Sequence, residues 1–204
     1  RRRRGAEAGT PRGGKGRLSA TQAVLEGLAP DGGLYAPAAI EPANLSMDAL
    51  LGLDKPAITA HIISRLIDDL PALSIEGIVQ SGYAGKFASP DLTPLVPLGE
   101  TNILQLYHGP TSAFKDMALL ILPRLMAASR AANRMEGDVL ILTATSGDTG
   151  TAALSGFMDA PNTRIMVFYP DGGVSDVQRA QMVTQEGSNV DVCAVRGDFD
   201  DAQR

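Results

Sequence analysis

Apolar residues recur at helical spacing through the first part of the chain. Ser19 and Gln22 form a capping box immediately before an apolar stretch, which is a typical start of a helix. Further along, apolar side chains return every three or four residues in segments 58–67 and 74–79, as they do on one face of a helix. The pattern therefore predicts a small, all-helical segment over residues 18–88.

The pattern changes near Pro90, where short apolar runs begin to alternate with amphipathic stretches. Two adjacent strands are expected first, because two apolar runs flank a polar Gly-Glu-Thr-Asn turn. The elements expected after Pro90 are strands at 94–98 and 103–107, a helix at 115–133, a strand at 139–145, a helix at 149–158, a strand at 165–169, a helix at 175–186 and a strand at 190–195. Strands that alternate with helices predict βαβ units around a twisted parallel sheet. We therefore expect an α/β fold in residues 89–204, preceded by the small helical domain.

The composition is that of a soluble globular protein, since 44% of the 204 residues are hydrophobic and 20% are charged. No apolar run approaches the roughly 20 residues of a membrane-spanning helix, and the first residues lack the apolar stretch of a signal peptide. Cys193 is the single cysteine, so an internal disulfide is excluded and a cytoplasmic location is expected. It lies in an apolar run, where we expect a core residue. One cysteine and two histidines also make a metal site unexpected.

Charge is distributed unevenly along the chain. Residues 1–17 contain seven Arg or Lys and one Glu, a net charge of +6. The overall net charge is −5, so residues 18–204 carry −11. A basic arm can bind nucleic acid, but this arm has no aromatic residue and precedes an acidic body, so we predict no nucleic-acid partner. Its Gly- and Arg-rich composition predicts a disordered tail for residues 1–17.

A lysine opens the helix expected from residue 115. The N-terminus of a helix favours anions, so a cation at this position is electrostatically unfavourable. The positive potential, together with desolvation by neighbours such as Phe114, favours the neutral amine, which is the form that makes a Schiff base. Lys115 is therefore a candidate catalytic residue. The alternative is that its side chain merely extends into solvent from the first helical turn, beside Asp116.

A second candidate feature is the segment Thr143–Gly150, which also joins a predicted strand to a predicted helix. Ligands of open α/β sheets bind at that edge, where helix N-termini present free N–H groups. Its serine and threonine supply hydroxyl groups, and its glycines let backbone N–H groups approach a carboxylate or phosphate. The segment matches neither the Walker pattern nor the dinucleotide pattern, and an ordinary helix cap is the alternative. Together, the two segments are what an amino-acid-binding enzyme dependent on pyridoxal 5′-phosphate (PLP) needs.

Five segments, in the same order, resemble threonine synthases, PLP enzymes of fold type II that are related to tryptophan synthase β. His108–Asp116 resembles the PLP-lysine motif of the family, Ala144–Gly150 its substrate loop, and Gly27–Tyr35 its N-terminal signature. The remaining matches are Tyr169-Pro170 with Ser175–Met182, and Gly197–Asp201, while Pro11–Gly13 stands where the family usually opens with Ser-Thr-Arg-Gly. The resemblance covers about residues 10–204. Its lysine segment and glycine loop separate the chain from cysteine synthases and from tryptophan synthase β.

The resemblance implies a role for each matching site residue. Lys115 would carry PLP as the internal aldimine and then move protons, with Phe114 and Asp148 also contacting the cofactor. Asp148 would lie near the phenolic oxygen of the ring. The residues implied to bind the substrate are Thr111, Ser112, Ser146, Gly147, Asp148, Thr149 and Gly150. Of these, the Ser146–Gly150 loop would hold the substrate carboxylate.

The implied reaction converts O-phospho-L-homoserine and water to L-threonine and phosphate by PLP-dependent β,γ-replacement, which is a carbon–oxygen lyase activity on a phosphate ester. One alternative is a similar phospho-lyase that releases 2-oxobutyrate. Another is a truncated, non-catalytic chain. Threonine synthases are more than twice as long as this sequence, so the resemblance implies a fragment that is inactive alone. The cradle for the cofactor phosphate would belong to the other half of such a protein.

Overall fold

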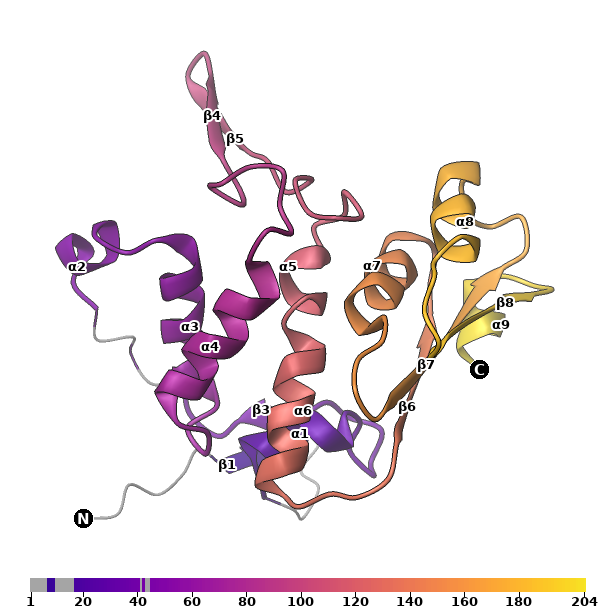
Figure 1. Ribbon diagram of the computed structural model, residues 1–204, viewed down its shortest axis with the longest axis horizontal. Helices are drawn as coiled ribbons and strands as arrows, with labels where there is room; N and C mark the ends of the chain where they lie inside the picture. Colours follow the sequence, from indigo (N-terminus) through magenta and orange to yellow (C-terminus); the bar gives the residue numbers. More distant parts are fainter. Residues whose placement is uncertain (1–6, 10–16, 41, 43–44) are drawn as a thin grey trace. The chain divides into compact units, whose positions relative to one another are not determined.

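The computed structural model describes residues 7–9, 17–40, 42 and 45–204, and it divides into two compact units. The first unit contains residues 1–81 and 124–136, and the second contains residues 82–123 and 137–204 (Figure 1). Most of the predicted basic tail, with its Pro11–Gly13 segment, lies outside the described residues. The boundary predicted between residues 88 and 89 stays a prediction, because compact units are not by themselves domains that fold alone.

The first unit is mainly helical, as the apolar spacing predicts. Its helices are α1 (Ala20–Glu26), α2 (Met47–Leu51), α3 (Lys55–Leu66), most of α4 (Ala72–Tyr83) and most of α6 (Leu122–Ala132). Its strands β1 (Glu7–Gly9), β2 (Leu18–Ser19) and β3 (Ala36–Pro37) pair in the antiparallel order β2-β1-β3. The sequence does not predict these strands, because two or three residues are too few to show an alternating pattern. The predicted capping box is confirmed, since Ser19 and Gln22 each accept a backbone N–H from the other.

Polar side chains fix the start of α1 within the first unit. Thr21 is 2% exposed, and its hydroxyl and backbone N–H both donate to the carboxylate of Asp69. Asn133 in turn donates its side-chain amide to the Thr21 hydroxyl at 2.9 Å. Because buried polar groups are costly when unpaired, this network ties the start of α1 to the residues that follow α3 and α6.

The second unit contains a parallel sheet of three strands. These are β6 (Val139–Ala144), β7 (Thr163–Pro170) and β8 (Val190–Val195), paired in the order β6-β7-β8. The helices are α5 (Asp116–Leu119), α7 (Asp148–Phe157), α8 (Asp176–Val183) and α9 (Phe199–Gln203), and a hairpin is formed by β4 (Leu95–Leu98) and β5 (Thr101–Leu104) (Figure 1). The predicted mixed α/β fold with a parallel sheet is confirmed. Along the described stretches of the chain, no helix has the length and apolar character needed to cross a membrane.

The single helix predicted over residues 115–133 is wrong, because two helices, α5 and α6, occupy this segment with a break at residues 120–121. Pro123 explains the break. It has no N–H to donate to the carbonyl of Leu119, four residues earlier, and its ring would collide with that carbonyl in a continuous helix. Pro123 therefore separates the short helix α5, which follows Lys115, from the longer helix α6.

Helices α5 and α7 pack closely in the second unit, and a glycine permits this. A Cβ atom added to Gly156 of α7 would collide with the carbonyl oxygen of Leu119, the carbonyl that Pro123 leaves without a helical partner. One face of β7 packs against α7, and Ile165 and Val167 on that face are fully buried. The glycine at position 156 therefore sets how near α5 lies to α7.

The opposite face of the sheet is exposed on β6, where Leu140 is 59% and Leu142 is 63% exposed. Cys193 of β8 pairs in register with Phe168 on this sheet and is exposed. The prediction that it is a core residue is therefore wrong. An apolar run shows that a strand is buried on at least one face, but the run itself does not say which side chains face outward.

The close contact of α5 and α7 predicts opposite effects for two mid-helix glycines. Gly156→Ala should lower the free energy of unfolding by about 1–3 kcal/mol, because the added methyl group collides with backbone. Gly77→Ala in α4 is the matched control, since nothing lies within 4 Å of its added Cβ. Gly77→Ala should raise the free energy of unfolding by about 0.4–1 kcal/mol, because alanine lowers the conformational entropy of the unfolded chain. Urea denaturation of both variants checks this, and a neutral Gly156→Ala would show that the helices do not meet there.

Candidate active site

Lys115 is the residue immediately before α5, with helical backbone angles of φ −62° and ψ −22°. Its side chain is half-buried, and Nζ lies 5.0 Å from the centroid of the Phe114 ring, in cation–π contact. Phe114 itself is 54% exposed. The carboxylate of Asp116 contacts Thr111 rather than this amine, so the aromatic ring is the neighbour that the structure gives to the lysine.

Asp116 closes the loop that presents the lysine. Its side chain is 1% exposed, and its two oxygens accept from the Thr111 backbone N–H at 2.9 Å and from the Thr111 hydroxyl at 2.7 Å. Burial raises the pKa of this carboxyl above its ordinary value near 3.8, although the hydrogen bonds from Thr111 act in the opposite direction. Gly109 lies against the same carboxylate, and any Cβ there would collide with it. The segment from Gly109 to Asp116 is therefore a closed loop that we name the lysine loop.

The segment Thr145–Gly150, which we name the glycine loop, is held by its own first side chain. Thr145 is 1% exposed, and its hydroxyl oxygen accepts from the backbone N–H groups of Gly147 at 3.0 Å and Gly150 at 2.8 Å. Gly150 also has no room for a side chain, because an added Cβ would lie 2.5 Å from Cγ2 of Thr145 and 2.7 Å from Cγ1 of Val167. The two glycine amides are thus used within the loop.

Other donors of the glycine loop remain for a ligand. Ser146 and Asp148 are exposed and Thr149 is half-buried, at the start of α7. Within the described part of the chain, the backbone N–H groups of Asp148 and Thr149 donate no hydrogen bond. Unpaired first-turn N–H groups at the positive end of a helix are suited to a carboxylate or phosphate.

Helix α8 contacts both loops through two glutamines. The side-chain amide of Gln178 donates to a carboxylate oxygen of Asp148 at 2.7 Å. The side-chain amide of Gln181 donates to the backbone carbonyl of Thr111 at 3.2 Å. The structure therefore brings the two predicted segments to the same helix. Sequence reasoning missed both glutamines, although the capping box of Ser175 and Gln178 marks the start of α8 in the sequence.

The remaining predicted residues have different surroundings. Thr111 is 8% exposed and its hydroxyl donates within the lysine loop. Ser112 is exposed and has φ of 60°, a left-handed conformation that is uncommon for serine. Neighbouring His108 accepts or donates a ring hydrogen bond with Gln105 at 2.8 Å and stacks on Tyr107. Of the predicted pocket pair, Ser112 is thus the residue with an available hydroxyl.

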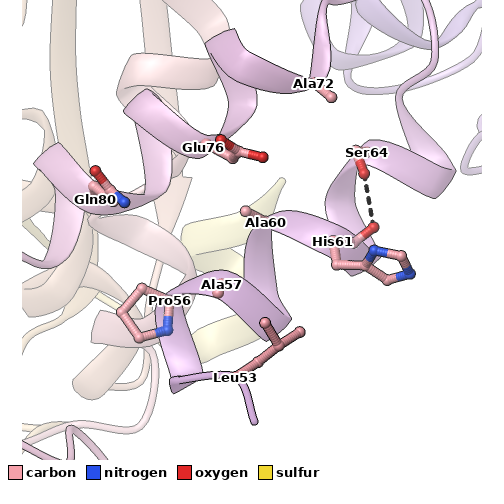
Figure 2. A pocket seen from close by; sticks show the side chains of 9 residues that line it. All are labelled: Leu53, Pro56, Ala57, Ala60, His61, Ser64, Ala72, Glu76 and Gln80. Carbon is pink, nitrogen blue, oxygen red and sulfur yellow. Dashed lines mark hydrogen bonds between the residues drawn. The ribbon is translucent and has the colours of Figure 1, made fainter. Parts of the chain in front are cut away.

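A cavity of about 390 Å³ lies in the first unit, between α3 and α4 (Figure 2). It is lined by Leu53, Pro56, Ala57, Ala60, His61, Ser64, Ala72, Glu76 and Gln80. The Ser64 hydroxyl donates to the carbonyl of His61 at 2.8 Å. None of the residues predicted to carry chemistry lines this cavity, so the candidate site is the pair of loops in the second unit.

Comparisons with known proteins show which proteins this chain is similar to. Residues 10–83 match the family model described as threonine synthase N terminus. Threonine synthase from Schizosaccharomyces pombe is 37% identical over 202 residues, covering 94% of this chain and 39% of that protein. Threonine synthase-like 1 from Pongo abelii is 36% identical over 207 residues, covering 95% of this chain and 27% of that protein.

A solved structure agrees with these matches. The crystal structure of PLP-bound threonine synthase from Brucella melitensis superposes with a TM-score of 0.83 at 34% identity, over 97% of this chain and 43% of that one. The chain thus has the α/β fold of the corresponding part of a PLP enzyme. More particularly, the predicted resemblance is confirmed, because this chain matches the N-terminal part of threonine synthases. It spans about two fifths or less of the length of these relatives.

The buried carboxylate of Asp116 predicts a pH-dependent stability. The folded state holds the proton to a higher pH than the unfolded state, so this group's contribution to stability is full below about pH 4 and is lost as pH rises through the raised pKa. Asp116→Asn does not titrate, so the stability of the wild type relative to this variant should fall across that interval and then level off. Urea denaturation from pH 3.5 to 8 measures the difference. A difference that is flat, or rises with pH, contradicts the prediction.

The hydroxyl of Thr145 predicts a contrast between two small substitutions. Thr145→Val leaves two buried N–H groups unpaired and should lower the free energy of unfolding by about 2–4 kcal/mol. Thr145→Ser keeps the acceptor and loses one methyl group, at a cost of about 1 kcal/mol. Equal losses in the two variants, measured by urea denaturation, would mean that the methyl group rather than the hydroxyl holds the glycine loop.

Proposed function

We propose that this chain supplies the PLP-binding lysine and the substrate loop of a threonine synthase, which converts O-phospho-L-homoserine and water to L-threonine and phosphate. The observation that carries the proposal is that one helix, α8, is hydrogen-bonded to the lysine loop and to the glycine loop. A reactive amine and an anion-binding loop held on one support are what an enzyme acting on an amino acid requires. The match to threonine synthases supports this choice of substrate.

The residues present fit PLP. Lys115 offers a primary amine for its aldehyde group, and the aromatic ring of Phe114 lies beside that amine. When bound, PLP supplies the electron sink that stabilises negative charge at carbon atoms of the substrate. Asp148 is the residue that the resemblance assigns to the phenolic oxygen of the cofactor ring.

The chain's own residues have distinct proposed roles. The amine of Lys115 accepts the proton from Cα of the substrate and returns protons as the reaction proceeds. The N–H groups of Asp148 and Thr149, with the hydroxyl groups of Ser146 and Thr149, hold the substrate carboxylate at the positive end of α7. Gly147 and Gly150 keep the loop close to its supports. Thr111 shapes the lysine loop, and Ser112 presents its exposed hydroxyl to the substrate side.

A related outcome of the same chemistry is a phospho-lyase that releases 2-oxobutyrate. It is kept as a second candidate because several of the matching relatives are named threonine synthase-like 1 rather than threonine synthase. The two activities diverge after loss of phosphate, according to whether water adds at Cβ. A cytoplasmic location is proposed with either activity. The third candidate, a non-catalytic chain, follows from its share of the length of its relatives.

The test of the cofactor assignment is borohydride trapping with PLP, followed by peptide mapping. The chain has four lysines, at positions 15, 55, 86 and 115, so three of them serve as internal controls. We expect one dominant adduct, on Lys115. Equal labelling of the four lysines would show that the polypeptide does not build the site.

Catalysis is tested in a full-length protein that carries this sequence. Lys115→Ala should lower kcat about a thousandfold, because the proton-transfer group is lost, while Lys86→Ala leaves it unchanged. Assays for threonine, phosphate and 2-oxobutyrate are run together. Formation of threonine and phosphate from O-phospho-L-homoserine supports the synthase, and formation of 2-oxobutyrate and phosphate supports the lyase. If no phosphate is released from O-phospho-L-homoserine, the non-catalytic chain is supported.

A further inference from the structure

Two glutamines of α8 lie three residues apart and therefore on the same face of the helix. Gln178 donates to the glycine loop at Asp148, and Gln181 donates to the lysine loop at Thr111. Both side chains are half-buried, and the neighbouring Met182 is 1% exposed, so α8 is anchored in the unit while its glutamines reach the loops. The helix connects Thr111 and Asp148, which lie 37 positions apart in the chain.

We propose that Gln178 and Gln181 are positioning residues that together set the relative placement of the lysine loop and the glycine loop. The bridge itself is a property of the fold. Its consequence for catalysis rests on the proposed function, since the two loops are then the supports of the reactive amine and of the substrate carboxylate. Sub-ångström placement of such groups has large effects on rate.

Gln178 uses its whole side-chain amide. Its oxygen accepts from the backbone N–H of Ser175 at 3.1 Å, and its NH₂ group donates to Asp148 at 2.7 Å. The same amide lies against Gly147, whose φ of 137° and lack of space both exclude a larger residue. Gln178 therefore joins the cap of α8 to the first turn of α7.

Gln181 acts on the lysine through a short chain of contacts. It donates to the carbonyl of Thr111, and the N–H and hydroxyl of Thr111 are held by Asp116, the residue next to Lys115. The carbonyl of Thr111 is a backbone group, so the contact fixes the loop itself and not only a side chain. Loss of this donor should loosen the lysine loop and leave the glycine loop unchanged.

Four variants separate the bridge from general stability. Gln178→Glu keeps an oxygen that can cap Ser175, but it replaces the donor to Asp148 with a second carboxylate. Ser175→Ala is its control, because it weakens the cap and leaves the bridge. Gln181→Met preserves size and loses the donor. Gln185→Met is the matched control, since Gln185 bonds Met158 and Glu186, outside both loops.

The first measurement is amide hydrogen exchange in the PLP-free protein. Gln178→Glu should speed exchange roughly tenfold in the peptide covering residues 145–151, and Gln181→Met should do so in the peptide covering residues 109–117. Each variant should leave the other peptide unchanged, and both controls should leave both peptides unchanged. Unchanged exchange in both loops, or equal changes in the control variants, would overturn the proposed bridge.

The second measurement is steady-state kinetics in a full-length protein that carries this sequence. Gln178→Glu should raise KM for O-phospho-L-homoserine several-fold, because it perturbs the carboxylate-binding loop. Gln181→Met should lower kcat several-fold with little change in KM, because it perturbs the lysine. If both variants showed the same fall in kcat together with the same rise in KM, the two glutamines would have a merely structural role. If the wild type is inactive, the proposed function fails, while the exchange data still decide whether the bridge exists.

Discussion

The buried pairing of Asp116 with Thr111 is the interaction on which the candidate site depends. A carboxylate removed from water needs donors, and the Thr111 backbone N–H and hydroxyl provide them within five residues of chain. The pairing folds the loop back on the start of α5, so Lys115 begins the helix at a fixed place rather than on a free loop. The same hydrogen bonds engage the carboxylate of Asp116, the acidic residue next to Lys115 in the chain. Among the residues that the structure describes, the amine forms no ion pair and lies over the ring of Phe114.

The break between α5 and α6 is a second constraint on the position of this loop. Pro123 ends the hydrogen-bonding ladder that would run through Leu119, and Gly156 lets α7 approach the carbonyl that is left. Helix α6 belongs largely to the first unit, whereas the lysine loop belongs to the second. The proline thus separates the part of the chain that carries the amine from the part that packs among the N-terminal helices.

Sequence reasoning reached the strands of the parallel sheet and the two loops, since each has a local signal. Val190–Val195, for example, is a mostly apolar segment of strand length bounded by polar residues, and it forms β8 as predicted. Three features could not be predicted because their causes are not local. Gln178 and Gln181 act on residues 30 and 70 positions away, so periodicity carries no trace of their partners. The exposure of Cys193 depends on which face of the sheet a helix covers. The use of two glycine amides by Thr145 requires the folded loop.

The glycine loop contains an apparent conflict that its surroundings resolve. A loop proposed to hold a substrate carboxylate carries a carboxylate of its own, Asp148, at the positive end of α7. Two anions would compete for the same first-turn N–H groups. Gln178 removes the competition, because its NH₂ group donates a hydrogen bond to the Asp148 carboxylate from the side of α8. Asp148 is then directed away from the N–H groups of its own turn, and these groups stay available to a ligand. In this arrangement a neutral donor on one helix maintains the anion-binding capacity of another.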